Sequence, residues 1–232
     1  MDVLLLQDRE REDNNMKAIA AMAGDRVIGL NTKIPWKNSL DMRFFKAMTL
    51  NHPVIVGRTT YEKMGPLKDR YHYVLSDSKN GKYTEGGTEY IAEFLTFDQL
   101  TKKKDLDDAW VIGGAKVYKQ LLPLCSELYM THIIGDYEGD TYMPEFEHLF
   151  DDQQIIYEGK DMWVVHYWKQ EWKSYENAYR FGFDAKLMGK DGNENPYELS
   201  HHPRDTTYDD ECNFQWSQGY DDAPWVWKMN YV

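Results

Sequence analysis

The 232-residue sequence predicts an α/β fold, in which a mixed, mostly parallel central sheet is flanked by helices and a small helical module follows at the C-terminus. From Met16 to Gln170, stretches typical of strands alternate with stretches typical of helices, as they do in βαβ units. The last two strand-like stretches follow one another without a helix, which predicts an antiparallel edge. After Gln170 the alternation stops, so we expect a domain boundary there.

The expected strands are short apolar, β-branched or aromatic runs bounded by turn residues. They cover residues 17–22, 54–56, 71–75, 89–91, 110–112, 128–134, 154–157 and 163–168. Helical spacing of apolar residues predicts helices over 40–50, 60–64, 97–104 and 115–122. Residues 28–36 contain Gly29 and Pro35 and are expected to form a long loop, which suits a mobile lid over a site or an ordinary surface loop.

The composition limits the classes of function. The chain has 27 Lys and Arg against 39 Asp and Glu, a net charge of −12, and such a surface repels nucleic acid and anionic membranes. No apolar run approaches the roughly 20 residues of a membrane span. The only cysteines are Cys125 and Cys212, too few for a disulfide framework or a cysteine-based zinc site. We expect a cytoplasmic protein without metal, membrane or nucleic-acid binding.

The charge divides the chain into three parts. Residues 1–15 hold 2 basic and 5 acidic side chains (net −3) and are expected to be an N-terminal extension, with Met16 as an alternative start. Residues 16–170 hold 19 and 22 (net −3), and residues 171–232 hold 6 and 12 (net −6). Four of the eight tryptophans lie in this last part, which therefore predicts a folded module rather than a disordered linker.

A carboxylate is expected on the apolar face of the helix at 40–50. Ser39 is expected to cap this helix, and Asp41 then shares one face with Phe44, Phe45 and Met48. Burial on that face would raise the pKa of Asp41 and favour a cationic or amidine-like ligand group. The alternative is a solvated first-turn aspartate that complements the helix dipole, and periodicity alone favours this alternative.

Two strand-to-helix junctions carry glycine and suit phosphate binding. Gly113 and Gly114 precede the helix at 115–122, while Arg58, Thr59 and Thr60 follow a glycine after the strand at 54–56. Glycine lets a ligand approach the backbone, and a helix start offers free N–H groups to an anion. Because no G-x-G-x-x-G is present, a tight turn without a ligand and a solvated arginine remain open at these two junctions.

Taken together, these stretches resemble the dihydrofolate reductase family over residues 16–170. The matching segments are, in order, IAAMAGDRVIG at 19–29, Pro35-Trp36, Asp41, Phe45, PVIVGR at 53–58, VIGG at 111–114, Tyr118, YMTH at 129–132 and EGDT at 138–141. The resemblance implies NADPH-dependent hydride transfer to C6 of 7,8-dihydrofolate, which gives tetrahydrofolate for thymidylate and one-carbon metabolism.

The resemblance also implies roles for individual residues toward the substrate. Asp41 would bind the pterin and tune it for protonation at N5 by water, Trp36 would position that water, and Thr131 would support Asp41. Arg70 would pair with the α-carboxylate of the glutamate tail, a bidentate task that suits arginine. Walls of the pterin and benzoyl site are implied at Ile19, Met42, Phe45, Met64 and Ile112.

The implied cofactor is NADPH, and the family's cis peptide would fall between Gly113 and Gly114. Asp77 departs from the family because it adds negative charge next to the hydroxyl expected for the adenosine 2′-phosphate. Arg58 and Lys116 remain available for that phosphate, so NADPH is expected, with NADH less excluded than usual. Cofactor contacts are implied at Ala21, Ile28, Gly29, Arg58, Thr59, Thr60, Ser76, Gly113, Gly114, Ala115, Lys116, Val117 and Tyr118.

Residues 171–232 resemble the small ribosome modulation factor module, through AYRFGFDA at 178–185, NPY at 195–197 and WSQGYDDA at 216–223. The net charge of −6 argues against RNA binding, so a docking module for an unknown protein partner, a helix pair packed on the reductase, or a purely stabilising appendage is expected. Two other functions stay open for the whole chain: a same-fold reductase of another pterin or a flavin precursor, and a catalytically silent pterin- or ribosome-associated binding protein.

Overall fold

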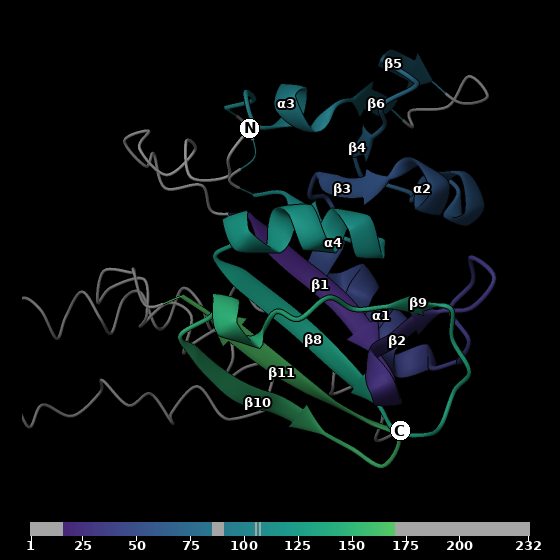
Figure 1. Cartoon of the computed structure of the whole chain (residues 1–232), viewed down its shortest axis with the longest axis vertical. Helices are drawn as coiled ribbons and strands as arrows, with labels where there is room; N and C mark the ends of the chain where they lie inside the picture. Colours follow the sequence, from purple (N-terminus) through teal and green to yellow (C-terminus); the bar gives the residue numbers. More distant parts are fainter. Residues whose placement is uncertain (1–15, 85–90, 105, 107, 170–232) are drawn as a thin grey trace, which may run out of the picture.

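The computed structural model describes residues 16–169, apart from 85–90, 105 and 107. The expected N-terminal extension of residues 1–15 and the expected C-terminal module of residues 171–232 lie outside the described residues. The described chain forms one large sheet with helices on both faces and a small two-stranded ribbon (Figure 1). The predicted α/β class is confirmed.

The strands of the large sheet are β1 Lys17–Met22, β3 Val54–Gly57, β4 His72–Leu75, β5 Gly81–Thr84, β6 Ile91–Leu95, β7 Trp110–Val111, β8 Glu127–Ile133, β10 Asp152–Glu158 and β11 Met162–Trp168. Their spatial order is β10-β11-β8-β1-β7-β3-β4-β6-β5. Neighbours from β8 to β6 run parallel. At the two ends of the sheet, β10, β11 and β5 each run antiparallel to their neighbour. The predicted mostly parallel sheet and its antiparallel edge are both confirmed.

The helices are α1 Ser39–Thr49, α2 Arg58–Met64, α3 Phe97–Leu100 and α4 Ala115–Leu121, with 3-10 turns η2 Gly24–Arg26, η3 Leu122–Leu124 and η4 Glu147–Leu149. The predicted helix at 97–104 is too long. Thr96 and Gln99 form a capping box that starts α3, and Leu100 is fully buried. The three lysines that follow at 102–104 add no apolar side chain to that face, so α3 stops after one turn.

The structure also corrects the strand prediction. The strand expected at 89–91 lies further along the chain as β6, because Ala92 and Phe94 pack into a core cluster with Val56 and Val74. The predicted loop at 28–36 begins with part of a strand, β2 Val27–Gly29, which pairs antiparallel with β9 Thr141–Tyr142. Strands of two to four residues such as β2, β5 and β9 lack the length that shows a clear alternation in sequence.

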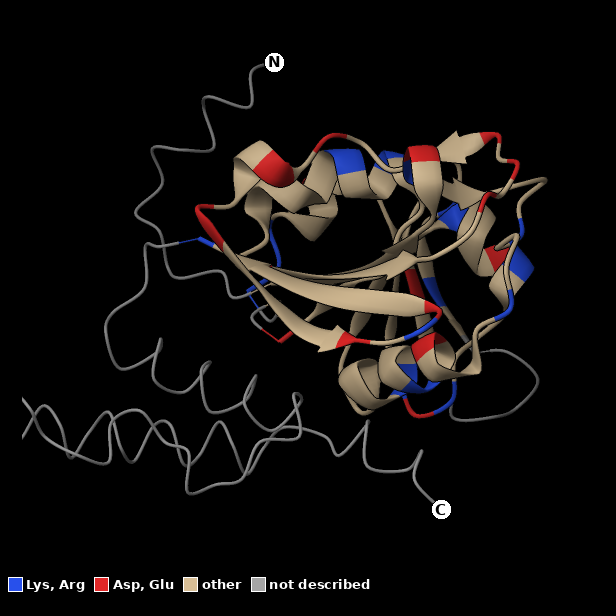
Figure 2. Ribbon diagram, turned by 90° about the horizontal axis from the view of Figure 1, so that it is seen from below, with Lys and Arg blue, Asp and Glu red and all other residues tan. Residues whose placement is uncertain are grey.

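The central strand β1 shows how the two faces of the sheet are covered. Ala18, Ala20 and Met22 pack in the core cluster that includes residues of α4. Ile19 packs on the opposite face, in the cluster with Phe44 of α1. This alternation follows from the two-residue period of a strand. The helices accordingly lie on both sides of the sheet, and Figure 2 shows the charged residues on helices, loops and strand ends around a mostly uncharged sheet.

The N-terminus of α1 fixes where the first-turn carboxylate points. Asn38 has an extended backbone, and its Oδ1 accepts hydrogen bonds from the backbone N–H groups of Leu40 (3.0 Å) and Asp41 (3.1 Å). The prediction that Ser39 caps this helix is therefore wrong, since Ser39 is already the first helical residue. Asn is among the preferred N-cap residues because its side-chain oxygen satisfies amides that the helix leaves unpaired.

Replacing Asn38 by alanine should lower the free energy of unfolding by about 1 kcal/mol, because two first-turn amides lose their acceptor. Urea denaturation of the purified protein measures this change. Ser39→Ala is the matched control, and its effect should stay below about 0.5 kcal/mol. A larger loss for Ser39→Ala than for Asn38→Ala would contradict the assignment of the cap.

Candidate active site

The predicted site residues gather where the parallel strands end. The backbone N–H of Gly57, at the end of β3, donates to the carbonyl of Gly113, which follows β7 (2.8 Å). This bond holds the two glycine junctions side by side at the carboxyl edge of the sheet. Ligands of open parallel sheets bind at this edge, in the crevice outside the strand ends.

Asp41 lies on the inward face of α1 and is only 7% exposed. Burial raises the pKa of this carboxyl group from 3.8 to about 6, while Thr131 acts in the opposite direction and lowers it. Phe44 and Met48, one and two turns further along, are also buried on this face. The interpretation of Asp41 as a buried carboxylate is confirmed, and the alternative of a solvated first-turn aspartate is wrong.

Polar groups from three other elements surround Asp41. Thr131, in β8, is fully buried, and Trp36, before α1, is 6% exposed and packs edge-on against Tyr137 at 5.6 Å. Among the described residues, Trp36 Nε1 is buried without a hydrogen-bond partner. Buried polar atoms of this kind usually pair with water or a ligand. The pKa of Tyr118 is raised by its burial and then by the charge of Asp41, while its hydroxyl donates to the carbonyl of Ile19 (2.8 Å).

The predicted substrate walls are brought together only in part. Ile19 belongs to the same core cluster as Trp36, and Phe45 and Ile112 pack against that cluster from α1 and from the end of β7. The side chains of Met42 and Met64, by contrast, are 54% and 39% exposed. A contact of these two methionines with substrate therefore stays a prediction.

Arg70 lies beside the helix that carries Asp41. Its guanidinium carbon is 5.8 Å from the centre of the Phe45 ring, and partial burial lowers the pKa of Arg70. Among the described residues, the buried Arg70 Nε has no hydrogen-bond partner. The side chain thus presents a cation near the outer edge of the apolar walls, where an anionic group of a ligand would be attracted.

The two glycine junctions leave no room for side chains. Gly113 has φ +98°, and a Cβ there would lie 2.7 Å from Cε2 of Tyr118. A Cβ on Gly114 would lie 3.0 Å from Thr60 Oγ1. The peptide between Gly113 and Gly114 is cis, as the resemblance implies. The structure therefore holds bare backbone at this edge of the sheet, as a closely approaching ligand requires.

Two short helices start at these junctions. Gly57 and Gly114 are the N-caps of α2 and α4, and neither helix start is capped by a side chain. Their first-turn N–H groups and the positive ends of the helix dipoles suit an anionic pyrophosphate. The predicted cofactor residues of these first turns are thus brought together: Arg58, Thr59 and Thr60 in α2, and Ala115, Lys116 and Val117 in α4. The donor set fits a dinucleotide.

Ser76 lies at the end of β4, next to the start of α2. Its Oγ accepts hydrogen bonds from the backbone N–H groups of Ser78 (3.3 Å) and Lys79 (3.0 Å), so it organises the turn after the strand. Lys79 Nζ lies 3.0 Å from Glu62 Oε1, and this bond, with the charges of Lys79 and Arg58, holds the pKa of Glu62 below its ordinary value. Arg58 therefore shares its surroundings with the acid–base pair of Lys79 and Glu62.

The remaining predicted residues lie along the segment between β1 and α1. Ala21 and Ile28 are half-buried against the two cores, and the carbonyl of Gly29 accepts a hydrogen bond from the backbone N–H of Asp140 (3.0 Å). Asp140 and Tyr137 were not among the predicted site residues. The EGDT motif at 138–141 could have pointed to Asp140. Nothing in the sequence points to Tyr137, because its partner Trp36 lies about a hundred positions away.

A separate groove of about 660 Å³ lies between α4 and residues 142–149. Lys116 and Tyr118 contribute to its lining, but Asp41 and the two glycine junctions do not. The groove is therefore distinct from the site around Asp41. Within the described residues, no cluster of three or more His, Cys, Asp or Glu side chains could hold a metal ion, and no helix is long and apolar enough to cross a membrane.

Comparison with known proteins identifies this arrangement. The family model for dihydrofolate reductase matches residues 15–167. The chain belongs to the dihydrofolate reductase family. Dihydrofolate reductase type 3 of Salmonella typhimurium is 39% identical over 129 residues, which cover 55% of this chain and 77% of that protein. The dihydrofolate reductase of Buchnera aphidicola subsp. Acyrthosiphon pisum is 32% identical over 172 residues, covering 73% and 97%.

A solved structure supports the same assignment. Dihydrofolate reductase from Enterococcus faecalis, complexed with NADP(H) and RAB-propyl, is 28% identical and covers 68% of this chain and 98% of that one, with a TM-score of 0.56. The dihydrofolate reductase domain of this chain therefore accounts for nearly all described residues. The resemblance found in the motifs is confirmed for this domain, while the module expected at 171–232 lies outside the residues that the family model matches.

Replacing Asp41 by asparagine should stabilise the reductase domain at neutral pH. The raised pKa means that the folded chain binds this proton more tightly than the unfolded chain does, so stability falls as the pH rises from about 4 to about 6. At about pH 7.5 we expect Asp41→Asn to raise the free energy of unfolding by about 2 kcal/mol. Urea denaturation across this range should show the gain shrinking toward pH 4, and a loss of stability at neutral pH would contradict the burial argument.

Proposed function

We propose that the reductase domain transfers hydride from NADPH to C6 of 7,8-dihydrofolate and thereby produces tetrahydrofolate for thymidylate and one-carbon synthesis. Membership of the dihydrofolate reductase family supports this function, and the similar Enterococcus faecalis enzyme is complexed with NADP(H). The observation that carries the proposal is the buried Asp41 carboxyl group beside the two glycine junctions. A carboxylate kept in an apolar wall selects a ligand with paired N–H donors.

In this proposal Asp41 binds and orients the pterin. Its two oxygens accept hydrogen bonds from the 2-amino group and the ring N3–H, and Thr131, on β8, holds the carboxylate in place. Two observations agree with this role of Thr131: its side chain is fully buried, and it lowers the pKa of Asp41. Ile19, Phe45 and Ile112 form the apolar walls, which exclude water and strengthen the hydrogen bonds.

Arg70 reads the other end of the substrate. Its guanidinium pairs with the α-carboxylate of the glutamate tail, which a planar fork of donors does better than an ammonium group. The position of Arg70 supports this role, because its guanidinium carbon lies 5.8 Å from the ring centre of Phe45, one of the apolar walls. A flavin precursor has no glutamate tail, so this arginine favours a folate over that alternative substrate.

The dinucleotide would lie along the first turns of α2 and α4. The bare backbone at Gly113 and Gly114 and the uncapped helix starts support this placement of its pyrophosphate. When bound, NADPH supplies the hydride that reduces the substrate. The chain's own part is to hold C6 of the substrate close to the cofactor and to order one water molecule. Trp36 positions the water that gives a proton to N5, and the charge of Asp41 raises the basicity of the pterin ring.

Asp41 should dominate the pH dependence of the reaction. In the free enzyme its pKa of about 6 predicts an ionisation near this pH in the profile of kcat/KM with dihydrofolate. Asp41→Asn should remove this ionisation and lower turnover by a factor of about 10² or more, because the asparagine cannot accept both pterin N–H groups. Binding of NADPH, followed by fluorescence, should change less than about threefold, and near-normal turnover at neutral pH would exclude the assigned role.

The preference for NADPH over NADH should depend on the charge of Asp77. The assay follows the loss of reduced-nicotinamide absorbance with dihydrofolate, with NADPH and NADH in parallel. We expect faster turnover with NADPH, because Arg58 and Lys116 attract the 2′-phosphate more than Asp77 repels it. Asp77→Asn should widen the preference for NADPH by about tenfold through KM. No turnover with either cofactor would reject the proposed function itself.

For residues 171–232 we propose a separate accessory module that docks an unidentified protein partner or packs on the reductase. Its resemblance to the ribosome modulation factor module and its four tryptophans support a folded unit. Its net charge of −6 supports a role other than RNA binding. The family match ends at residue 167, which supports a boundary near residue 170.

Truncation after Gln170 should therefore leave a folded and active reductase, because the match to the family is complete before this point. The expected kcat lies within about twofold of the full chain, and the thermal transition should remain a single cooperative step. Circular dichroism and the NADPH assay on the purified truncated protein measure both. An insoluble or inactive product would show that residues 171–232 complete the core of the reductase domain.

A further inference from the structure

The segment between β1 and α1 carries two residues of the proposed site, Ile28 and Trp36. Trp36 packs against Tyr137, and Ile28 packs against the core on the α4 side of the sheet. Val27 is buried in the same core cluster as Trp36, and the segment also pairs with residues 139–147. The position of this second segment therefore contributes to where the first one lies relative to Asp41.

The pairing itself is short. The ribbon of β2 and β9 has only two registered pairs, Val27 with Tyr142 and Gly29 with Thr141. Asp140 extends it, because its backbone N–H donates to the Gly29 carbonyl (3.0 Å) and its Oδ2 accepts from the backbone N–H of Asn31 (2.8 Å). A two-stranded ribbon of this size is at best marginally stable alone. Other contacts must hold it.

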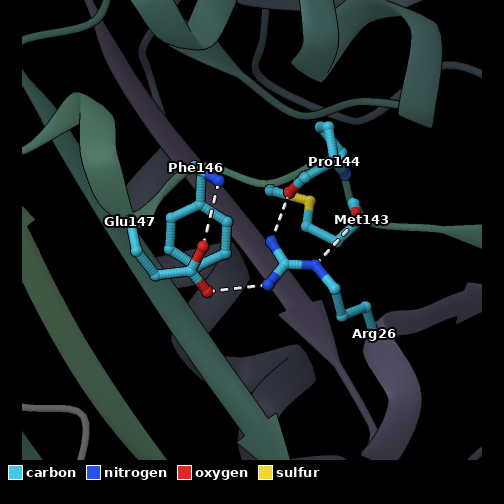
Figure 3. Close-up of polar contacts among 5 residues, drawn as sticks. All are labelled: Arg26, Met143, Pro144, Phe146 and Glu147. Atoms are coloured by element: carbon cyan, nitrogen blue, oxygen red, sulfur yellow. Dashed lines mark hydrogen bonds and ion pairs between the residues drawn. The ribbon is translucent and has the colours of Figure 1, made fainter.

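Arg26 supplies those contacts (Figure 3). Its Nε donates to the carbonyl of Met143 (3.0 Å), one terminal nitrogen donates to Glu147 Oε1 (2.7 Å), and the other donates to the carbonyl of Pro144. The guanidinium also lies over the Phe146 ring, at 5.0 Å from its centre. The backbone carbonyl of Arg26 accepts from the N–H of Met143 (2.8 Å), so this one residue contacts the partner segment through side chain and main chain.

The carboxylate of Glu147 is oriented to accept the hydrogen bond from Arg26. Its Oε2 accepts from the backbone N–H of Phe146 (3.1 Å), which leaves Oε1 for Arg26. Partial burial raises the pKa of Glu147, but the hydrogen bonds from Arg26 and from the backbone outweigh burial and leave the pKa below its ordinary value. The carboxylate is therefore ionised at neutral pH, and the bond to Arg26 is charge-assisted.

The backbone at this point also needs support. Asp25 and Arg26 have φ values of 53° and 62°, in the left-handed region that Gly, Asn and Asp adopt most readily and that arginine seldom adopts. Two consecutive residues in this region persist only where surrounding contacts over-determine them. The four contacts of Arg26 with Met143, Pro144 and Glu147 add to the local bonds that close this turn, from the N–H of Ala23 to the carbonyl of Val27 (2.9 Å) and from the N–H of Val27 to the carbonyl of Gly24.

We propose that Arg26 is a positioning residue for hydride transfer: its guanidinium fastens the segment carrying Ile28 and Trp36 to residues 143–147 and thereby holds that segment over the site of Asp41. This inference rests on the proposed function. A segment held in place keeps water out and keeps the reacting groups in their productive geometry, which a loose segment does not. Arginine is required because only its planar fork reaches two carbonyls and a carboxylate at once.

Two single substitutions test the clamp, and the chain offers a matched control. Arg26→Lys keeps the charge but loses the fork, and Glu147→Gln removes the charge that Arg26 contacts. Glu145→Gln makes the same change two residues away, on an exposed side chain that makes no contact with Arg26 among the described residues. The three variants are compared with the full-length parent protein. A double variant that combines Arg26→Lys with Glu147→Gln completes a double-mutant cycle, which measures the interaction between the two residues.

Single-turnover kinetics at saturating NADPH and dihydrofolate provide the first measurement. We expect hydride transfer to slow about tenfold in Arg26→Lys and in Glu147→Gln, with KM for dihydrofolate changing less than about threefold. The double variant should be little slower than either single variant, and Glu145→Gln should stay within about twofold of the parent. A merely structural role would lower the melting temperature and leave this rate unchanged in the folded enzyme.

Hydrogen exchange of the protein without ligands provides a measurement independent of activity. The backbone N–H groups of Asn31, Asp140 and Met143 are hydrogen-bonded across the two segments and should exchange about tenfold faster in both clamp variants than in Glu145→Gln. Unchanged exchange and unchanged single-turnover rates would overturn the proposal. If the parent protein itself does not oxidise NADPH, the proposed function fails, while the exchange experiment still reports whether Arg26 holds the segment.

Discussion

The close approach of β3 and β7 at the carboxyl edge of the sheet is the constraint on which the rest of the site depends. It leaves no space for a side chain at Gly113, because the ring of Tyr118 fills that space. Tyr118 in turn donates from its hydroxyl to the carbonyl of Ile19 (2.8 Å), so the helix that starts at the glycine pair is tied to the central strand. The same contact brings Tyr118 to the neighbourhood of Asp41. One steric requirement thus ties the start of α4 to the strand that lies beside the Asp41 site.

The site combines two electrostatic environments within a short distance. Asp41 lies among apolar side chains that disfavour its charge, whereas the starts of α2 and α4 present N–H groups that favour an anion. This combination is complementary to a ligand with paired N–H donors at one end and phosphates at the other. The protein maintains this arrangement at a cost, since an ionised carboxyl group in an apolar wall destabilises the folded chain.

Much of this organisation could be predicted from the sequence, because it depends on patterns that are local. The apolar run of β1 and the helical spacing that sets Asp41 beside Phe44 are examples. The N-cap of α1 could not be predicted in this way. Asn38 and Ser39 are both suitable cap residues, and only the backbone angles distinguish them. Arg26 could not be predicted at all, because its partners lie 117 to 121 positions away and leave no periodic signal.

The strand order has a consequence for synthesis of the protein on the ribosome. Ala18 of β1 pairs with Val111 on one side and with Leu128 on the other, which follow it by 93 and 110 positions. The strand made first therefore occupies the middle of the sheet and acquires its neighbours late, when most of the domain has emerged. Until then its apolar side chains and its unpaired backbone groups are open to other chains. Translation pauses before residue 127 would prolong this exposure, because β8 would not yet be available to pair with β1.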